Sequence, residues 1–385
     1  MRLSHHISAA ALAGAFVIYG CDAVGPETGS TTADARGGNT QSYIVVFEDG
    51  VQNPRALAKG LANGQATHVY ETTIKGFAAR FSPQAAAALA RNPNVAYVEP
   101  DEVATLAPPC GTPNGSPCDG GGGGGDGGGS QSTPYGITRV GGGGSGAGLV
   151  ACVIDSGVDL DHPDLNVDGA KSRTFITSGK DSRSADDGNG HGTHVAGTIG
   201  ALDNGQGVIG VAAGASIIGI KVLDSRGSGA YSAVIAGVEY AATAGCSVAN
   251  MSLGGPVSQA LDDAVLAAAA QGVAFALAAG NETDAAANHS PARAGGVSLS
   301  DNVYAISAVD ANDDFAYFSN YGADVEYAAP GVAIESTWKN GGYSTISGTS
   351  MASPHAAGVL LFGNPGTSGF ANGDPDGDPD PIISL

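Results

Sequence analysis

The chain has 385 residues, of which 42% are hydrophobic and 14% charged, so a sizeable buried core is expected. Its formal net charge of −21 argues against a protein that binds nucleic acid through a basic face. The same charge suits an extracellular protein that self-repulsion keeps dispersed, and we expect a monomer.

Residues 1–24 have the features of a secretory signal peptide. Arg2 precedes a mainly apolar run over residues 7–19, which is too short to span a bilayer. Residues 18–21 resemble a bacterial lipoprotein signal in which Cys21 carries the lipid; ordinary cleavage that leaves a cysteine is the alternative. We therefore expect a secreted bacterial protein whose precursor is either free or tethered through Cys21.

Residues 41–106 predict a compact unit of their own. Ser82 and Pro83 suit the N-cap and first position of a helix. The strand and helix patterns follow the order βαββαβ, which suggests a small α+β, ferredoxin-like domain. The expected strands cover 43–47, 68–71, 76–81 and 95–101, and the expected helices cover 54–61 and 82–90.

Residues 107–132 are predicted to form a linker. Positions 120–129 hold nine glycines and one aspartate, a composition typical of flexible connections. Cys110 and Cys118 flank a segment rich in proline and glycine, and we expect them to pair readily in an oxidising compartment.

Residues 133–370 alternate apolar strands with helical patterns, which predicts an α/β domain with a mostly parallel sheet flanked by helices. Cys152 and Cys246 lie beside predicted core strands, where a disulfide and two buried thiols are both consistent with the sequence. The clearest segments are strands at 217–223, 248–253 and 273–278 and helices at 231–244 and 259–271.

Three polar residues of this region have settings suited to nucleophilic catalysis. Asp155 ends the apolar run 150–154, at the strand edge where functional residues of open α/β sheets gather. His191 opens a helical pattern, and Ser350 lies among small residues just before another. A serine hydroxyl becomes a nucleophile when an adjacent base takes its proton.

Simpler interpretations exist for two of them. Asp155 can cap the turn after its strand, and His191 with His194 can suggest a metal site. The chain has neither the His-Glu-x-x-His pattern nor a cluster of cysteine ligands, so we expect His194 to be a packed helix residue. The three segments together favour catalysis.

The segments around Asp155, His191 and Ser350, in that order, resemble the motifs of the subtilisin-like serine proteases (subtilases, peptidase S8 family), including the proteinase K-like members. The resemblance implies a subtilisin-like α/β fold and a serine endopeptidase that acts on proteins and peptides. Ser350 would attack the scissile carbonyl, His191 would transfer the proton, and Asp155 would orient His191. No cofactor is implied for the chemistry.

Segment 273–282 resembles the oxyanion-hole motif of the family, so Asn281 would donate to the tetrahedral intermediate together with the Ser350 backbone N–H. The alternative is an ordinary Gly-Asn turn. The family also implies that substrate binds by strand addition along Ser252, Leu253 and Gly254, with Ala279 and Gly280 as the opposite pocket wall. We expect this S1 pocket to be wide and uncharged, with broad specificity for large apolar side chains.

Segments 43–45, 76–79 and 95–99 resemble the family's inhibitor I9-type propeptide. The resemblance implies an intramolecular inhibitor and a zymogen, with residues 103–106 lying in the active site and autocleavage near Leu106. Aligned on residues 329–331, Glu326 falls where proteinase K-like members place an aspartate ligand of calcium, so a structural calcium ion is the one ion implied.

The chain ends soon after the serine segment, where family members continue into further helices. We expect residues 371–385 to form a solvated acidic tail, with calcium binding as the alternative, and the serine helix to be exposed. Three functions compete: an active secreted endopeptidase, an inhibitory protein that never matures, and a calcium-dependent surface protein. The complete set of Asp155, His191, Ser350 and Asn281 favours the first.

Overall fold

The computed structural model describes residues 40–106, 130–297 and 302–385. The predicted signal peptide, Cys21 and the pair Cys110–Cys118 lie outside these ranges. Within them, no helix combines the length and apolar character needed to cross a membrane.

The N-terminal domain has the predicted βαββαβ order, with its strands arranged β2-β3-β1-β4 and every neighbouring pair antiparallel. Side-chain caps set its helix starts: Asn53 accepts the Ala56 N–H (2.9 Å), and Ser82 accepts the Ala85 N–H (3.2 Å). The elements are β1 (Gln41–Phe47), α1 (Pro54–Leu61), β2 (His68–Tyr70), β3 (Gly76–Phe81), α2 (Pro83–Leu89) and β4 (Val95–Pro100). The ferredoxin-like prediction is therefore confirmed.

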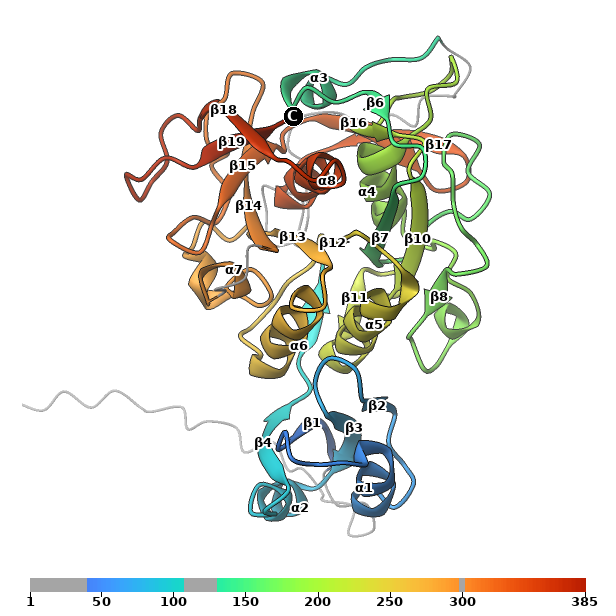
Figure 1. Ribbon diagram of the computed structural model, residues 1–385, viewed down its shortest axis with the longest axis vertical. Coiled ribbons are helices and arrows are strands. Elements are labelled where there is room, and N and C mark those ends of the chain that lie inside the picture. The colour runs from blue at the N-terminus through green and yellow to red at the C-terminus, as the bar shows by residue number, and fades with distance from the viewer. Residues whose placement is uncertain (1–39, 107–129, 298–301) are drawn as a thin grey trace, which may run out of the picture. The chain divides into compact units, whose positions relative to one another are not determined.

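The C-terminal domain is built on a nine-stranded sheet in the order β18-β19-β15-β14-β13-β12-β7-β10-β8 (Figure 1). Its strand pairs are parallel, apart from the antiparallel pair β18 and β19. In chain order the strands are β7 (Val150–Asp155), β8 (Arg173–Thr174), β10 (Ser216–Lys221), β12 (Val248–Met251), β13 (Ala274–Ala278), β14 (Val303–Val309), β15 (Tyr327–Pro330), β18 (Gly366–Phe370) and β19 (Pro381–Ser384).

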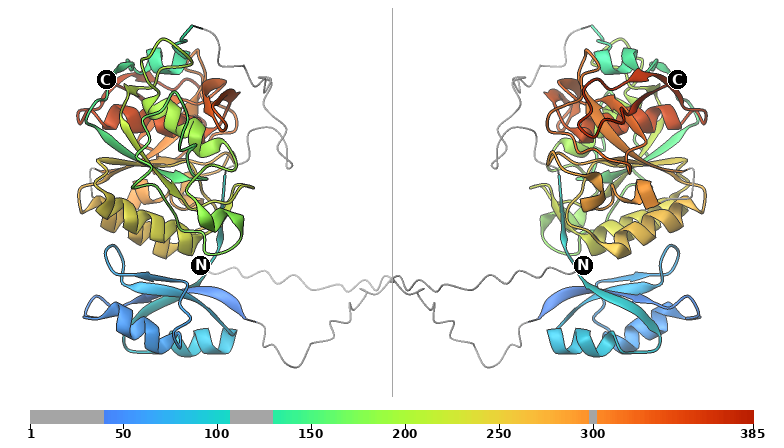
Figure 2. Two further views of the ribbon diagram at one scale, coloured as in Figure 1. Left: turned by 90° about the vertical axis from the view of Figure 1, so that its right-hand side faces the viewer. Right: turned by 90° about the vertical axis from the view of Figure 1, so that its left-hand side faces the viewer.

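Helices cover both faces of this sheet, as predicted for an α/β domain. Helices α4 and α8 contribute to one buried cluster, and α5 and α6 to another, on opposite sides of the strands (Figure 1). Helices α5 and α6 lie side by side (Figure 2). The helices are α3 (Tyr135–Arg139), α4 (His191–Gly200), α5 (Tyr231–Ala244), α6 (Gln259–Ala269), α7 (Ala294–Val297) and α8 (Thr349–Leu360), with short 3-10 helices η1 (Lys180–Arg183) and η2 (Ala286–Asn288).

Strand β7 shows why a continuous apolar run was the correct signal. Ala151 and Val153 belong to the α4/α8 cluster, whereas Cys152 and Ile154 belong to the α5/α6 cluster. Successive side chains of a strand point to opposite faces, so a strand buried on both faces has no polar alternation.

Cys152 and Cys246 form a disulfide, which settles the alternative left open by the sequence. Their Cα atoms are 5.7 Å apart and 94 residues separate them along the chain. The bond joins β7 to the segment between α5 and β12.

Three two-stranded sheets complete the fold. One pairs β11 (Ser228–Ala230) with β5 (Val103–Thr105), and the others pair β16 (Ile334–Trp338) with β17 (Gly342–Ile346) and β6 (Gly144–Ser145) with β9 (Ala212–Ala213). Near the start of the catalytic domain, the Gln131 side-chain amide donates to the Leu202 carbonyl (2.6 Å) and to the Val208 carbonyl (3.2 Å).

The prediction of a solvated tail over residues 371–385 is wrong for its last part. Strand β19 adds to the sheet edge beside β15, and Ile382 and Ile383 are fully buried. Leu385 donates its N–H to the Val140 carbonyl (2.9 Å), which places the C-terminus beside α3 (Figure 1). The apolar side chains of Ile382 and Ile383 pack into the core, and the acidic composition of the preceding residues gave no sign of this contact.

The expectation of an exposed serine helix is also wrong, because every residue of α8 is buried. In the acidic turn before β19, the Asp376 side chain accepts the Asp378 N–H at 2.8 Å and the Asp374 side chain accepts the Asp380 N–H at 3.3 Å. Among the described residues, no three acidic, histidine or cysteine side chains converge in a way that would hold a metal ion.

Asp380 anchors β19 and predicts a pH-dependent stability. It is buried, accepts the Ser307 hydroxyl (2.5 Å), and burial raises its pKa from 3.8 to about 7. A folded-state pKa above the unfolded value means that the stabilisation is complete at low pH and is lost as pH rises from about 4 to 7. We expect Asp380→Asn to flatten this loss, measured as the thermal unfolding midpoint between pH 4 and 8. The exposed neighbour Asp378, replaced by Asn, is the control; an equal effect there would contradict this account.

Candidate active site

Asp155 and His191 meet at the end of β7 and the start of α4. His191 Nδ1 lies 2.9 Å from Asp155 Oδ1 and 3.0 Å from Oδ2, and Asp155 is completely buried. The Ser156 N–H donates to the same carboxylate at 2.6 Å. The carboxylate can therefore hold the imidazole in the orientation that leaves Nε2 for proton transfer.

A second buried carboxylate, Asp187, joins the two elements that carry this pair. It accepts the Ser156 hydroxyl (3.0 Å), the Gly190 N–H (2.9 Å) and the Thr193 N–H (3.0 Å). Ser156 follows Asp155, whereas Gly190 and Thr193 flank His191. Asp187 thus fixes the first turn of α4 against the end of β7.

Ser350 lies in the first turn of α8 and lines the same cleft as His191 and Asn281. Its hydroxyl donates to the Ser252 carbonyl at 3.3 Å, and the Ser252 hydroxyl donates back to the Ser350 carbonyl at 2.8 Å. Catalytic hydrogen bonds often tighten only when substrate is bound, so this arrangement is compatible with later transfer to His191. The cleft is therefore lined by His191 and Ser350, and Asp155 is buried behind His191.

Asn281 follows β13 and is oriented by Thr349, the residue before Ser350. Its side-chain oxygen accepts the Thr349 N–H (2.9 Å) and the Thr349 hydroxyl (2.8 Å). The amide nitrogen is thereby turned toward Gly348, where a Cβ atom would stand 3.1 Å from it. Gly348 keeps that space open, so Asn281 has a donor available next to Ser350.

The two other histidines of these helices are held neutral by the core. His194 Nε2 donates to the Ile334 carbonyl (3.0 Å), and burial, with the nearby His191 second, lowers the pKa of His194 to about 3. Burial likewise lowers the pKa of His355 to about 4. His194 is therefore the packed helix residue that the sequence predicted.

The cleft contains a strand from the chain's own N-terminal part. Thr105 exchanges both backbone hydrogen bonds with Gly254 (3.0 and 3.1 Å), and the Leu106 N–H donates to the Gly227 carbonyl (2.9 Å). Strand β5 also pairs with β11 on its other side. The segment 103–106 is thus held between two edges, as an extended peptide substrate would be.

Beside this strand is a small cavity of about 40 Å³. Four of the five predicted substrate-binding residues line it, namely Leu253, Gly254, Ala279 and Gly280. The fifth, Ser252, does not line it, and its carbonyl accepts the Ser350 hydroxyl. The expectation of a wide, uncharged pocket is wrong, because Glu282 and His289 line it as well.

Glu326 does not find a calcium-binding environment among the described residues. One of its oxygens accepts the Ala305 N–H at 2.6 Å, and burial, with Asp324 contributing, raises its pKa to about 8. Calcium takes six to eight oxygen ligands, mostly ionised carboxylates and carbonyls. Because no third acidic side chain joins Asp324 and Glu326, we derive no catalytic or structural step through such an ion.

Comparison with known proteins agrees with this geometry. Residues 146–362 match the subtilase family, and residues 42–107 match the peptidase inhibitor I9 family. Subtilisin NAT from Bacillus subtilis subsp. natto is 40% identical over 343 residues, covering 86% of this chain and 82% of that protein. The chain belongs to the subtilase family.

Two other relatives extend the comparison. Alkaline serine exoprotease A from Vibrio alginolyticus is 40% identical to this subtilase over 350 residues, covering 83% of this chain and 60% of that protein. The crystal structure of a cold adapted subtilisin-like serine proteinase is 41% identical, with a TM-score of 0.52, over 59% of this chain and 83% of that chain. The subtilase is a serine-type endopeptidase with an I9 propeptide domain.

Sequence reasoning missed three parts of this site. The edge strand β11 and Gly227 were hidden because a short run of glycine and serine has no periodicity, although its position after an apolar strand was a usable signal. The orienting contact of Thr349 and the placement of His289 depend on tertiary packing, and no sequence signal marked them.

Thr349 should affect the rate more than substrate binding. We expect Thr349→Val to lower kcat about five- to tenfold with little change in KM, because it removes one hydrogen bond that orients the Asn281 donor. Asn281→Ala should cost about 10²–10³ in kcat. Steady-state kinetics on a peptide substrate measure both. Equal losses in the two variants, or an effect on KM alone, would contradict the orienting role.

Proposed function

We propose that this subtilase is a secreted endopeptidase made as a self-inhibited zymogen, with Asp155, His191 and Ser350 as its catalytic triad. The observation that carries the proposal is the placement of the strand 103–106 in the cleft lined by His191, Asn281 and Ser350. A chain that binds its own backbone beside a nucleophile and an oriented base has a peptide-hydrolysing site.

The proposed reaction is acyl transfer. Ser350 Oγ attacks the scissile carbonyl while His191 Nε2 takes its proton, and Asp155 stabilises the imidazolium. The peptide C–N bond breaks as His191 returns the proton to the leaving amine. Water then repeats the sequence on the acyl-enzyme, releasing the acid and restoring Ser350. No other reactant is needed.

Two donors face the developing oxyanion in this proposal: the Asn281 side-chain amide and the Ser350 backbone N–H at the start of α8. They are preorganised before substrate arrives, because Thr349 fixes Asn281 and α8 is buried. Preorganised donors in a dry site contribute most to such reactions.

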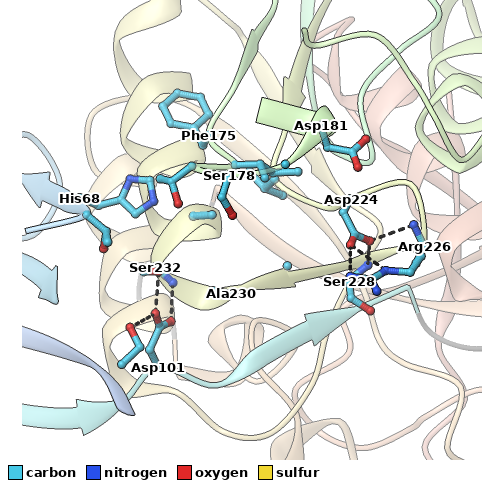
Figure 3. Close-up of a pocket in the computed structure, with 18 of the residues that line it drawn as sticks. His68, Asp101, Phe175, Ser178, Asp181, Asp224, Arg226, Ser228, Ala230 and Ser232 are labelled. Carbon is cyan, nitrogen blue, oxygen red and sulfur yellow. Dashed lines mark hydrogen bonds and ion pairs between the residues drawn. The ribbon is translucent and has the colours of Figure 1, made fainter. Parts of the chain in front are cut away.

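The propeptide is bound through carboxylates as well as through its tail. Asp101 accepts the Ser232 N–H (2.9 Å) and the Ser232 hydroxyl (2.7 Å) in the first turn of α5 (Figure 3). Glu99 likewise accepts the Ser258 hydroxyl (2.5 Å) and the Gln259 N–H (3.1 Å) at the start of α6. Negative charge at a helix N-terminus is favourable, so both contacts hold the tail in the cleft.

For substrates, strand addition along Gly254 and β11 supports broad recognition, since backbone hydrogen bonds do not discriminate between side chains. We propose an apolar-leaning preference at P1, because most of the cavity beside Thr105 is lined by Leu253, Gly254, Ala279 and other small or apolar groups.

The deciding experiment compares the wild-type chain with Ser350→Ala. We expect the wild type to release a fragment that begins between residues 107 and 135, seen by mass spectrometry, and to hydrolyse casein. Ser350→Ala should remain full length and inactive. If both chains stay intact and neither cleaves casein, the protein acts instead as an inhibitor that does not mature.

Export is a separate part of the proposal. Residues 1–24 support secretion, and Cys21 would tether the precursor if it carries lipid. Growth with a radiolabelled fatty acid should label the wild-type precursor and leave Cys21→Ala unlabelled. An unlabelled wild type, or a labelled Cys21→Ala, contradicts the tether and leaves ordinary secretion.

A further inference from the structure

The loop that carries Asn281 is shaped by the glycine before it. Asn281 comes just after β13, and the preceding Gly280 has a φ of +108°, in the left-handed region that favours glycine. A Cβ atom on Gly280 would stand 2.3 Å from Nδ2 of Asn320, a residue of the loop between β14 and β15. Any side chain at position 280 would therefore push Asn320 away from the loop.

Asn320 is completely buried and holds the part of this loop that precedes Asn281. Its backbone N–H donates to the Gly280 carbonyl (3.0 Å), and its side-chain Nδ2 donates to the Ala279 carbonyl (3.0 Å). Ala279 is itself fully buried, so without Asn320 its carbonyl would lose a partner away from water. One residue thus fixes two successive peptide groups immediately before Asn281.

The Asn320 side chain also holds the part of the loop that follows Asn281. Its Oδ1 accepts the Glu282 N–H and the Asp284 N–H, both at 3.0 Å. Its Nδ2 makes a second donation, to Glu282 Oε2 at 2.7 Å. An asparagine amide can donate two hydrogen bonds and accept two, so the Asn320 amide uses its full capacity on the residues around Asn281.

Thr349 and Asn320 control different parts of Asn281. Thr349 binds the side-chain oxygen of Asn281 and so sets the direction of its amide nitrogen. The bonds of Asn320 go to the residues before and after Asn281, so they set where its backbone lies. The two sets of bonds meet at Gly280, whose N–H donates to the Thr349 hydroxyl (3.2 Å) while its carbonyl accepts from Asn320.

We propose that Asn320 is a positioning residue of the oxyanion hole, which acts on the reaction only by fixing the backbone on both sides of Asn281. This inference rests on the proposed peptidase function. An oxyanion donor stabilises the transition state when it is aimed in advance at the place where charge develops. A displacement of about 1 Å can cost about 10² in rate. Thr349 orients the Asn281 amide, but a loop that shifts would carry the amide away from that place.

The full chain provides the assay, because the strand 103–106 already lies in the cleft. Chains purified in denaturant are refolded at a dilution where the rate of self-cleavage does not depend on concentration. The rate constant for appearance of the cut chain, followed by mass spectrometry, then reports the chemistry without a substrate-binding step. We expect Asn320→Ala to lower this rate constant about tenfold, within the range that misplacement of a catalytic group produces.

A double-mutant cycle separates positioning from general stabilisation of the fold. Asn281→Ala alone should slow self-cleavage by about 10²–10³. If Asn320 acts through Asn281, adding Asn320→Ala to that variant should slow it by less than about twofold more, because the group that Asn320 positions is already gone. A residue that only stabilises the fold would give the same loss in both backgrounds.

Thr283→Ala is the matched control. The Thr283 hydroxyl donates to the Tyr317 carbonyl (3.0 Å) and so joins the same two loops, but at an exposed position and without contacting the residues that flank Asn281 in the cleft. Its self-cleavage rate should stay within about twofold of the wild type, since an exposed hydrogen bond contributes little. Asn320→Ser is the second variant if Asn320→Ala does not fold, and should give a smaller loss that also disappears in the Asn281→Ala background.

Three outcomes overturn the inference and leave the peptidase function standing. They are an unchanged rate in Asn320→Ala, an equal loss with and without Asn281, and a tenfold loss in Thr283→Ala, which would mean that any contact between the two loops suffices. If instead the wild type does not cut itself and matches Ser350→Ala, the proposed function itself has failed.

Discussion

The site depends on one buried interaction, the hydrogen bond from His191 to Asp155. A carboxylate with no solvent contact must be compensated by fixed donors, and here the imidazole and the Ser156 N–H provide them. The need to supply buried carboxylates with donors also determines how the neighbouring elements are placed. Strand β7 has to end where α4 begins, and Asp187 spans that junction with its own set of donors. Moving either element would leave two buried charges without partners.

The features of the fold and the site that could be predicted from the sequence are those that depend on local residue patterns. Asp155, His191 and Ser350 each stand at the boundary between an apolar run and a turn or helix. The fold class followed from the order of strands and helices, whereas the joint role of these three residues was implied by the resemblance to the family. Ser82 likewise marked a helix start that the structure confirms. In these cases neighbours along the chain determine the outcome.

Other parts depend on which distant segments meet. The acidic composition near Asp380 concealed that Ile382 and Ile383 complete the core, because hydrophobic burial of a few residues outweighs a run of charges in the preceding turn. His289 lines the cavity beside Thr105 and comes from a loop in which the sequence shows no recognisable pattern. The pairing of Cys152 with Cys246 required the distance between β7 and the end of α5. Such features arise from tertiary packing, for which a single sequence has no periodic signal.

The contacts of Gln131 bear on the order in which the chain folds and is cleaved. Gln131 is bound to the carbonyls of Leu202 and Val208 while Thr105 is paired with Gly254, and both contacts exist in the same uncut chain. The uncut chain therefore already holds the start of the C-terminal domain and the strand in the cleft in place at the same time. Autocleavage, as proposed, would act on a domain whose first residues are already docked, and its consequence would be to free the cleft of the strand 103–106.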